Sequence, residues 1–92
     1  MHFESEEQII EKLKELFEKD HEAINKPINL SKDTLLHYTA YHKKSKITYF
    51  LLQKGANKNA QNTFNLRPVE VIRHDPDGND KEAVEQLIVA LS

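Results

Sequence analysis

The side chains able to do chemistry are few in this chain of 92 residues, and none of them forms a catalytic pattern. There is no Cys, which excludes a thiolate nucleophile, a thiolate zinc site and a disulfide framework. His37 has no nucleophile beside it, and none of the four serines lies in a G-x-S-x-G turn. The two glycines, Gly55 and Gly78, form no G-x-x-x-x-G-K phosphate loop. We therefore expect no enzyme and no cofactor.

The segment 75–80, with the sequence Asp-Pro-Asp-Gly-Asn-Asp, invites a metal hypothesis because hard cations bind several oxygens on a tight loop. An EF-hand loop needs glycine at its sixth position and glutamate at its twelfth. Counted from Asp75, these positions hold Asp80 and Gln86. The same sequence is ordinary turn chemistry, since proline sets φ and glycine relaxes it. We predict a turn without a metal, and calcium binding is the alternative.

The elements that would position any site begin with an amphipathic helix near Glu6. Ser5 and Gln8 have the spacing of a capping box. Apolar residues then recur at helical spacing, while charged residues occupy the rest of the helical wheel. These apolar residues are Ile9, Ile10, Leu13, Leu16 and Phe17. The segment 25–33 is turn chemistry, in which Pro27 disfavours helix at the preceding residue, and it predicts an extended loop.

Two shorter helical patterns follow, over 35–40 and 47–52, and they are too close for a sheet crossover. They predict a helix hairpin around the polar segment 42–45. Gly55 stands where the second helix needs a left-handed C-cap. The segment 56–65 is a second extended polar connection.

A last helix is predicted after a capping box at Asn79 and Glu82. Its apolar residues cover most of its circumference: Val84, Leu87, Ile88, Val89 and Leu91. This helix is therefore either fully packed or covered by something else. A second copy of the chain and a further segment of a longer parent chain are both open.

The charge is arranged in three blocks that the net charge of −2 conceals. Residues 1–25 carry eight acids and three bases, residues 26–67 carry one acid and eight bases, and residues 68–92 carry six acids and two bases. Acidic flanks repel phosphates, so the pattern argues against nucleic-acid binding. A basic centre favours a protein partner with an acidic surface. The run Lys43-Lys44-Ser45-Lys46 is interpreted as a solvated turn, with partner steering compatible.

The chain opens with acidic residues where a leader would be basic, and no apolar run is long enough to span a bilayer. With 38 % hydrophobic and 30 % charged residues, it is expected to fold and to dissolve. We expect a cytoplasmic protein that does not bind a membrane, and delivery into a host cell stays open.

The helix hairpin and its loop closely resemble an ankyrin repeat. Segments 34–40 (T-L-L-H-Y-T-A) and 47–60 (I-T-Y-F-L-L-Q-K-G-A-N-K-N-A) resemble the family patterns T-P-L-H-x-A and I-V-x-x-L-L-x-x-G-A-D-V-N-A. A weaker copy starts at Arg67, thirty-three residues after Thr34, and the opening helix resembles the outer helix of a truncated repeat. Lys43 stands where the family usually has glycine between the helices. We count about two and a half repeats.

The resemblance implies an all-α fold, an ankyrin-type helix-turn-helix solenoid with extended loops and degenerate terminal repeats. Residues 1–92 would form a single domain, divided into an N-terminal capping half-repeat (1–29), a full repeat (30–62) and a C-terminal capping repeat (63–92). The resemblance also implies that His37 is a structural link that hydrogen-bonds loop backbone. Asn59 resembles an asparagine that hydroxylases modify in such domains, and we interpret it mainly as a turn residue.

In the ankyrin family, loop tips and exposed positions of the inner helix form the partner surface. By resemblance these positions fall on Leu30, Ser31, Asp33, Tyr41, His42, Phe64, Leu66, Arg73 and His74. Four of them would form an exposed apolar strip: Leu30, Tyr41, Phe64 and Leu66. The alternative is that Phe64 and Leu66 tuck under the loop and brace it. Tyr41 is the first candidate for a contact residue.

These expectations describe a non-catalytic adaptor or inhibitor that binds another protein through loop tips and inner helices. The alternative is a capping, targeting or oligomerisation segment of a larger, effector-like ankyrin-repeat protein. The low repeat count and the apolar last helix motivate this alternative, because that helix would then pack in a homodimer or against the parent chain.

Overall fold

The computed structural model describes residues 5–72 and 81–92, and every regular element within these ranges is helical. The elements are α1 (Glu6–Lys19), η1 (His21–Asn25), α2 (Leu35–Tyr41), α3 (Ser45–Gln53), η2 (Pro68–Val71) and α4 (Lys81–Leu91), where η marks a 3-10 helix. The expected all-α class is confirmed for this part of the chain. No helix of the two described ranges combines the length and the apolar character that a membrane crossing needs.

Helix α1 begins where its capping box predicts. The Gln8 backbone N–H donates to Ser5 Oγ at 3.2 Å, and the Ser5 N–H donates to Gln8 Oε1 at 3.0 Å. Near the other end of the helix, the buried Phe17 ring stacks on Phe50 of α3, with ring centroids 6.1 Å apart. Asp20 then ends α1 and starts η1, because its Oδ1 accepts the Glu22 N–H at 3.1 Å.

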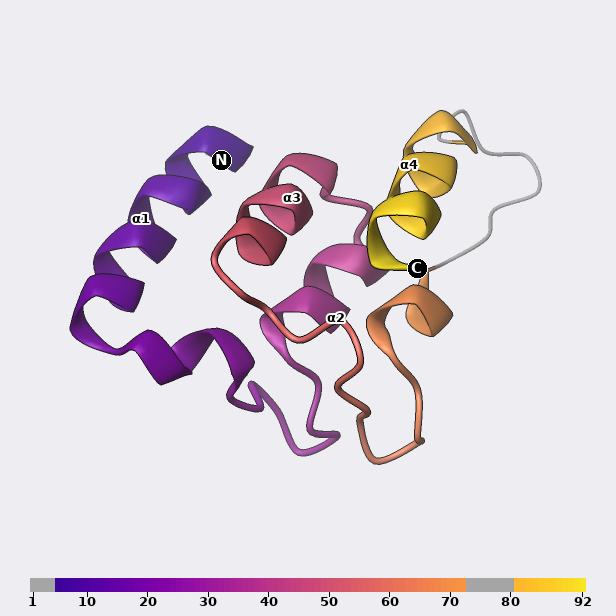
Figure 1. Cartoon of the computed structure of the whole chain (residues 1–92), viewed down its shortest axis with the longest axis horizontal. Helices are drawn as coiled ribbons and strands as arrows, with labels where there is room; N and C mark the ends of the chain where they lie inside the picture. Colours follow the sequence, from indigo (N-terminus) through magenta and orange to yellow (C-terminus); the bar gives the residue numbers. More distant parts are fainter. Residues whose placement is uncertain (1–4, 73–80) are drawn as a thin grey trace, which may run out of the picture.

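The helices form two layers (Figure 1). In one layer, α3 lies between α1 and α4 and contacts both. In the other, α2 contacts η2, while α2 also packs on α3 and η2 on α4. The space between the layers is filled by leucines that are almost fully buried, namely Leu36, Leu51, Leu87 and Leu91. Because α3 borders three other helices, it is the centre of this core.

The extended loops of the first and second halves lie side by side in a regular register (Figure 1). The Asn57 N–H donates to Asn25 Oδ1 at 2.8 Å, and the Thr63 N–H donates to the Ser31 carbonyl at 2.9 Å. In both bonds the two residues are 32 positions apart. The second loop therefore runs alongside the first and is hydrogen-bonded to it.

Left-handed backbone occurs at four described positions, and two of them, Gly55 and Lys43, were singled out in the sequence. Gly55 has a φ of +92° at the end of α3, as its C-cap position predicts. Lys43 has a φ of +58° in the turn between α2 and α3, where the ankyrin family usually has glycine. A side chain in this conformation costs roughly 1–2 kcal/mol, because Cβ lies too close to the carbonyl oxygen.

We expect Lys43→Gly to have a free energy of unfolding about 0.5 kcal/mol higher than that of Lys43→Ala, a comparison in which both variants lose the interaction of the lysine side chain. Relief of the left-handed conformation (roughly 1–2 kcal/mol) exceeds the extra chain entropy that glycine loses on folding (roughly 0.5–1 kcal/mol). Urea denaturation measures the change. Lys44→Gly is the matched control, because Lys44 has a φ of −91° and glycine should only destabilise there. A Lys43→Gly variant less stable than Lys43→Ala would contradict the expected strain at this position.

The C-terminal part departs from the pattern of the full repeat. Segment 67–72, which aligns with the start of an inner helix, forms only the 3-10 helix η2, and Ile72 is already extended. Pro68 at the first position and the β-branched Val69, Val71 and Ile72 explain why the helix is short, since β-branched residues disfavour helix. The capping box at Asn79 lies outside the described residues.

Helix α4 buries Val84, Leu87 and Leu91 against α3 and η2. Val89 points away from this contact and is 77 % exposed. The apolar surface of α4 is therefore packed only in part, because Val89 remains exposed.

Candidate functional site

Helix α2 and the 62–66 loop border a groove of about 420 Å³, in the layer that contains α2 and η2. It is lined by Asp33, His37, Tyr38, Tyr41, Asn62, Phe64, Leu66 and Val71, and we call it the aromatic groove. Its volume lies within the range of about 300–1,000 Å³ that is usual for ligand pockets. Four of the nine contact residues expected from the sequence meet here, namely Asp33, Tyr41, Phe64 and Leu66.

Aromatic side chains dominate the wall formed by α2. Tyr38, Tyr41 and His42 lie on one side of this helix, because residues three and four positions apart are neighbours on a helix surface. The His42 ring centroid is 4.4 Å from that of Tyr38 and 5.0 Å from that of Tyr41. Tyr38 is 53 % exposed and Tyr41 47 % exposed, so this cluster faces solvent instead of filling the core.

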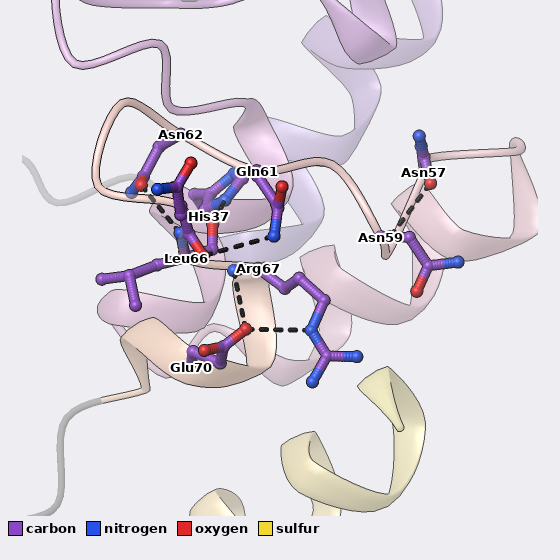
Figure 2. A network of polar contacts seen from close by, with 9 residues as sticks. His37, Asn57, Asn59, Gln61, Asn62, Leu66, Arg67 and Glu70 are labelled. Carbon is purple, nitrogen blue, oxygen red and sulfur yellow. Dashed lines mark hydrogen bonds and ion pairs between the residues drawn. The ribbon is translucent and has the colours of Figure 1, made fainter.

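His37 joins the two sides of the aromatic groove (Figure 2). Its side chain is 1 % exposed. The Thr34 backbone N–H donates to Nδ1 at 3.1 Å, which requires Nδ1 to be unprotonated. Nε2 therefore carries the hydrogen and donates to the Leu66 carbonyl at 2.7 Å. The expectation that His37 is a structural link to loop backbone is confirmed.

Asn62 shapes the 62–66 loop. Its Oδ1 accepts the backbone N–H groups of Phe64 at 2.9 Å and Leu66 at 3.1 Å. Its Nδ2 donates to Asp33 Oδ1 at 2.9 Å, which ties this loop to the loop before α2. Because Asn62 is buried and both its amide oxygen and its amide nitrogen are hydrogen-bonded, it braces the loop that presents Phe64.

Asp33 carries the one formal charge among the side chains that line the aromatic groove, with His37 neutral. Asn29 Nδ2 donates to Asp33 Oδ2 at 3.0 Å, beside the bond from Asn62. Partial burial on its own raises the pKa of this carboxyl. The hydrogen bonds from Asn29 and Asn62 oppose the effect of burial, and the pKa of Asp33 is held below its ordinary value.

This lowered pKa predicts an acid dependence of stability. The ionised Asp33 stabilises the fold at pH values above the unfolded pKa of about 3.9, and this stabilisation is lost as the pH falls through the lower folded value. We expect Asp33→Asn to lose less stability than the natural chain between about pH 5 and pH 3. Urea midpoints across this range measure the difference. Glu15→Gln, on the exposed face of α1, controls for loss of one negative charge, and equal acid dependence of all three proteins would contradict the prediction.

The other five contact residues predicted from the sequence do not line the aromatic groove or lie outside the described residues. Leu30 is fully exposed, and Ser31, whose carbonyl bonds the neighbouring loop, is partly buried; neither lines the groove. His42 contacts the two tyrosines without lining it. Arg73 and His74 lie outside the described residues.

The alternative that Phe64 and Leu66 tuck under the loop and brace it is wrong for Phe64 and agrees with the partial burial of Leu66. Phe64 is 68 % exposed, so it does not tuck under the loop. Leu66 is partly buried, and its backbone holds both the His37 and the Asn62 contacts. Leu30, Tyr41 and Phe64 thus supply the exposed apolar surface, while Leu66 mainly supports the loop.

Three lining residues were not predicted from the sequence: Tyr38, Asn62 and Val71. Tyr38 carried a usable signal, because it precedes Tyr41 by three positions and His42 by four, the spacing of one helix face. Asn62 and Val71 carried none, since their roles depend on contacts with α2 and the loop before it.

The basic centre of the chain is paired in part with the acidic flanks. Nitrogen–oxygen contacts join Lys46 to Glu7 at 2.6 Å, Lys26 to Asp20 at 2.8 Å and Arg67 to Glu70 at 2.9 Å. The hydrogen bond from Lys46 lowers the pKa of Glu7, and that from Lys26 lowers the pKa of Asp20. Exposed pairs of this kind add little stability, but they place neutralising charge beside these bases.

A metal site is not formed by the described part of the chain, in which no three His, Asp or Glu side chains are grouped closely enough to hold an ion. Segment 75–80, the candidate calcium loop, lies outside the described residues. No family model matches the chain, and no curated protein or solved structure matches it either. The groove itself is therefore the basis for a function.

Proposed function

We propose that this chain is a non-catalytic protein-binding module of ankyrin type, which holds a partner protein in the aromatic groove. The observation that carries the proposal is a cluster of three solvent-exposed aromatic side chains, Tyr38, Tyr41 and Phe64, around a groove with a rigid frame. Exposed aromatic residues grouped at a concavity are typical of the energetic centre of protein interfaces.

Three features support the ankyrin-type arrangement. The hairpin of α2 and α3 has the short, left-handed turn at Lys43 that the family pattern requires. The neighbouring loops are hydrogen-bonded with an offset of 32 residues, close to the repeat length of 33. His37, at the histidine position of the motif, bonds the next loop through Leu66.

The frame of the aromatic groove is organised before any partner arrives. On α2, the tyrosines are anchored by buried Leu36 and Ala40 on the opposite side of the helix. On the loop, Asn62 fixes the backbone on both sides of Phe64. A rigid frame favours affinity, because less conformational entropy is lost on binding.

The basic centre of the sequence favours a partner with an acidic surface. We keep this part of the proposal only for the protein surface outside the lining of the aromatic groove. Lys26, Lys46 and Arg67 already lie against carboxylates of the chain itself. The exposed Lys32 and Lys44 supply the positive charge that would steer such a partner. The aromatic groove carries the opposite sign.

The double substitution Tyr41→Ala/Phe64→Ala tests the proposal. We expect it to abolish capture of a specific partner from source or candidate host lysates, and each single change to weaken binding of the purified partner by about tenfold or more. Far-UV circular dichroism should stay unchanged, because both side chains are exposed. Tyr49→Ala, at an exposed tyrosine of α3 outside the groove lining, is the matched control.

Loss of helical signal in both single variants would make these residues structural and overturn the proposal. Proteins captured equally by the natural chain and the double variant would favour the second candidate, a capping, targeting or oligomerisation segment of a larger protein. The exposed Val89 on α4 is the observation behind that candidate, since a second copy or a parent chain would cover it.

A further inference from the structure

The aromatic groove combines one carboxylate with a wall of aromatic rings. Asp33 lines it together with Tyr38, Tyr41 and Phe64, and no lysine or arginine is among the described residues of the lining. Aromatic rings carry negative charge on their faces, so they attract cations as the carboxylate does. All charged and aromatic groups that line the groove therefore favour the same sign of ligand.

The carboxylate of Asp33 has capacity left for a ligand. An ionised carboxylate offers about four lone-pair positions on its two oxygens. Within the chain, Oδ1 accepts one bond from Asn62 and Oδ2 accepts one bond from Asn29. Each oxygen can accept a further hydrogen bond, and these two amide donors hold the carboxylate in position at the groove.

The side chain of one neighbouring base, Arg67, is bound to a carboxylate of the chain itself. Arg67 follows the lining residue Leu66 in sequence, but its Nε donates to Glu70 Oε1 at 2.9 Å, the contact that Figure 2 shows as a dashed line. The charge of Arg67 is thus matched by a carboxylate of η2. An acidic side chain entering the groove would meet Asp33 without a compensating base among the lining residues.

We propose that the aromatic groove receives a cationic side chain, arginine or lysine, from a segment of the partner protein. The charged group lies over the rings of Tyr38, Tyr41 and Phe64 and donates hydrogen bonds to the Asp33 carboxylate. Cation–π attraction and a charge-assisted hydrogen bond act together on one group, which gives selectivity for a base over an apolar residue of similar length. This inference rests on the proposed function and names the chemistry that the groove recognises.

Short random peptides displayed on phage provide the test. Peptides are selected on the natural chain and counter-selected on Tyr41→Ala/Phe64→Ala, so that those which depend on the groove remain. We expect arginine or lysine at one aligned position. Replacement of that residue in a synthetic peptide by citrulline or norleucine, which are neutral and of similar length, should weaken binding by about tenfold or more.

On the protein, Asp33→Asn should weaken binding of the basic peptide by about five- to tenfold. Asp20→Asn, at an aspartate paired with Lys26 outside the groove lining, should leave it unchanged. The citrulline and norleucine peptides need no protein variant, so the proposal is testable even if Asp33→Asn disturbs the loop.

Groove-dependent peptides that lack a basic residue, or that bind equally well after neutral replacement, would overturn the cationic proposal and leave the protein-binding function standing. Selection that yields no groove-dependent peptide would count against both.

Discussion

Leu51→Ala is expected to lower the free energy of unfolding by about 3–5 kcal/mol, the upper part of the range for leucine truncations in a core. Leu51 is fully buried in α3, which contacts α1, α2 and α4. A cavity at this position therefore lies within the helix on which the other three pack. Because small domains have a total stability of about 5–15 kcal/mol, the variant should be close to its unfolding threshold at room temperature.

Urea denaturation at constant protein concentration measures the effect of Leu51→Ala. Gln53→Ala, at an exposed position of the same helix, is the control and should change stability by less than about 0.5 kcal/mol. A loss below about 1 kcal/mol in Leu51→Ala would show that α3 is not the common packing centre of the other helices.

His37→Ala should lower the free energy of unfolding by about 2–4 kcal/mol. Removal of the imidazole leaves the Thr34 N–H without its acceptor, and an unsatisfied buried group costs about 1–3 kcal/mol. The Leu66 carbonyl keeps the bond from the Asn62 N–H and loses the shorter one from His37, and the lost packing of the buried ring adds to the cost. The loop that presents Phe64 also loses its tie to α2, so binding in the groove should weaken in the same variant.

Two measurements check this prediction: urea denaturation for global stability, and amide hydrogen exchange of Thr34 for the local bond. Exchange at Thr34 should become faster, because its N–H loses its acceptor. His21→Ala, at an exposed histidine of η1, is the control. Stability of His37→Ala equal to that of the control would mean that water replaces the imidazole at no cost.

Local signals made much of the fold predictable from sequence. The Ser5 and Gln8 capping box marked the start of α1, and Gly55 marked the end of α3, because both depend on residues only a few positions apart. The helix hairpin followed from apolar spacing in the same way. His37 was predictable through the repeat motif, although its bond to Leu66 spans 29 residues.

The aromatic groove was predictable only in part. Repeat positions pointed to Tyr41 and Phe64, but the role of Asn62 depends on Asp33, which lies 29 residues earlier and comes close only when the two loops stack. The short η2 was also missed, since the repeat pattern favours an inner helix where Pro68 and β-branched residues permit a single turn. Contacts between loops, and not local preference, decide these features.

The hydrogen bonds from Asn57 to Asn25 and from Thr63 to Ser31 also bear on how such a chain can grow. Each bond joins one loop to the equivalent place on the previous loop, 32 residues earlier. A duplicated copy of 30–62, inserted in frame, would carry its own Ser31 and would offer that carbonyl to the loop that follows it, so the bond that Thr63 makes would be repeated. Asn25 lies outside 30–62, so the side-chain bond to Asn57 would not be copied. The stack can therefore lengthen by whole units through backbone bonds between loops, whereas the side-chain bond from Asn57 to Asn25 stays specific to the first loop.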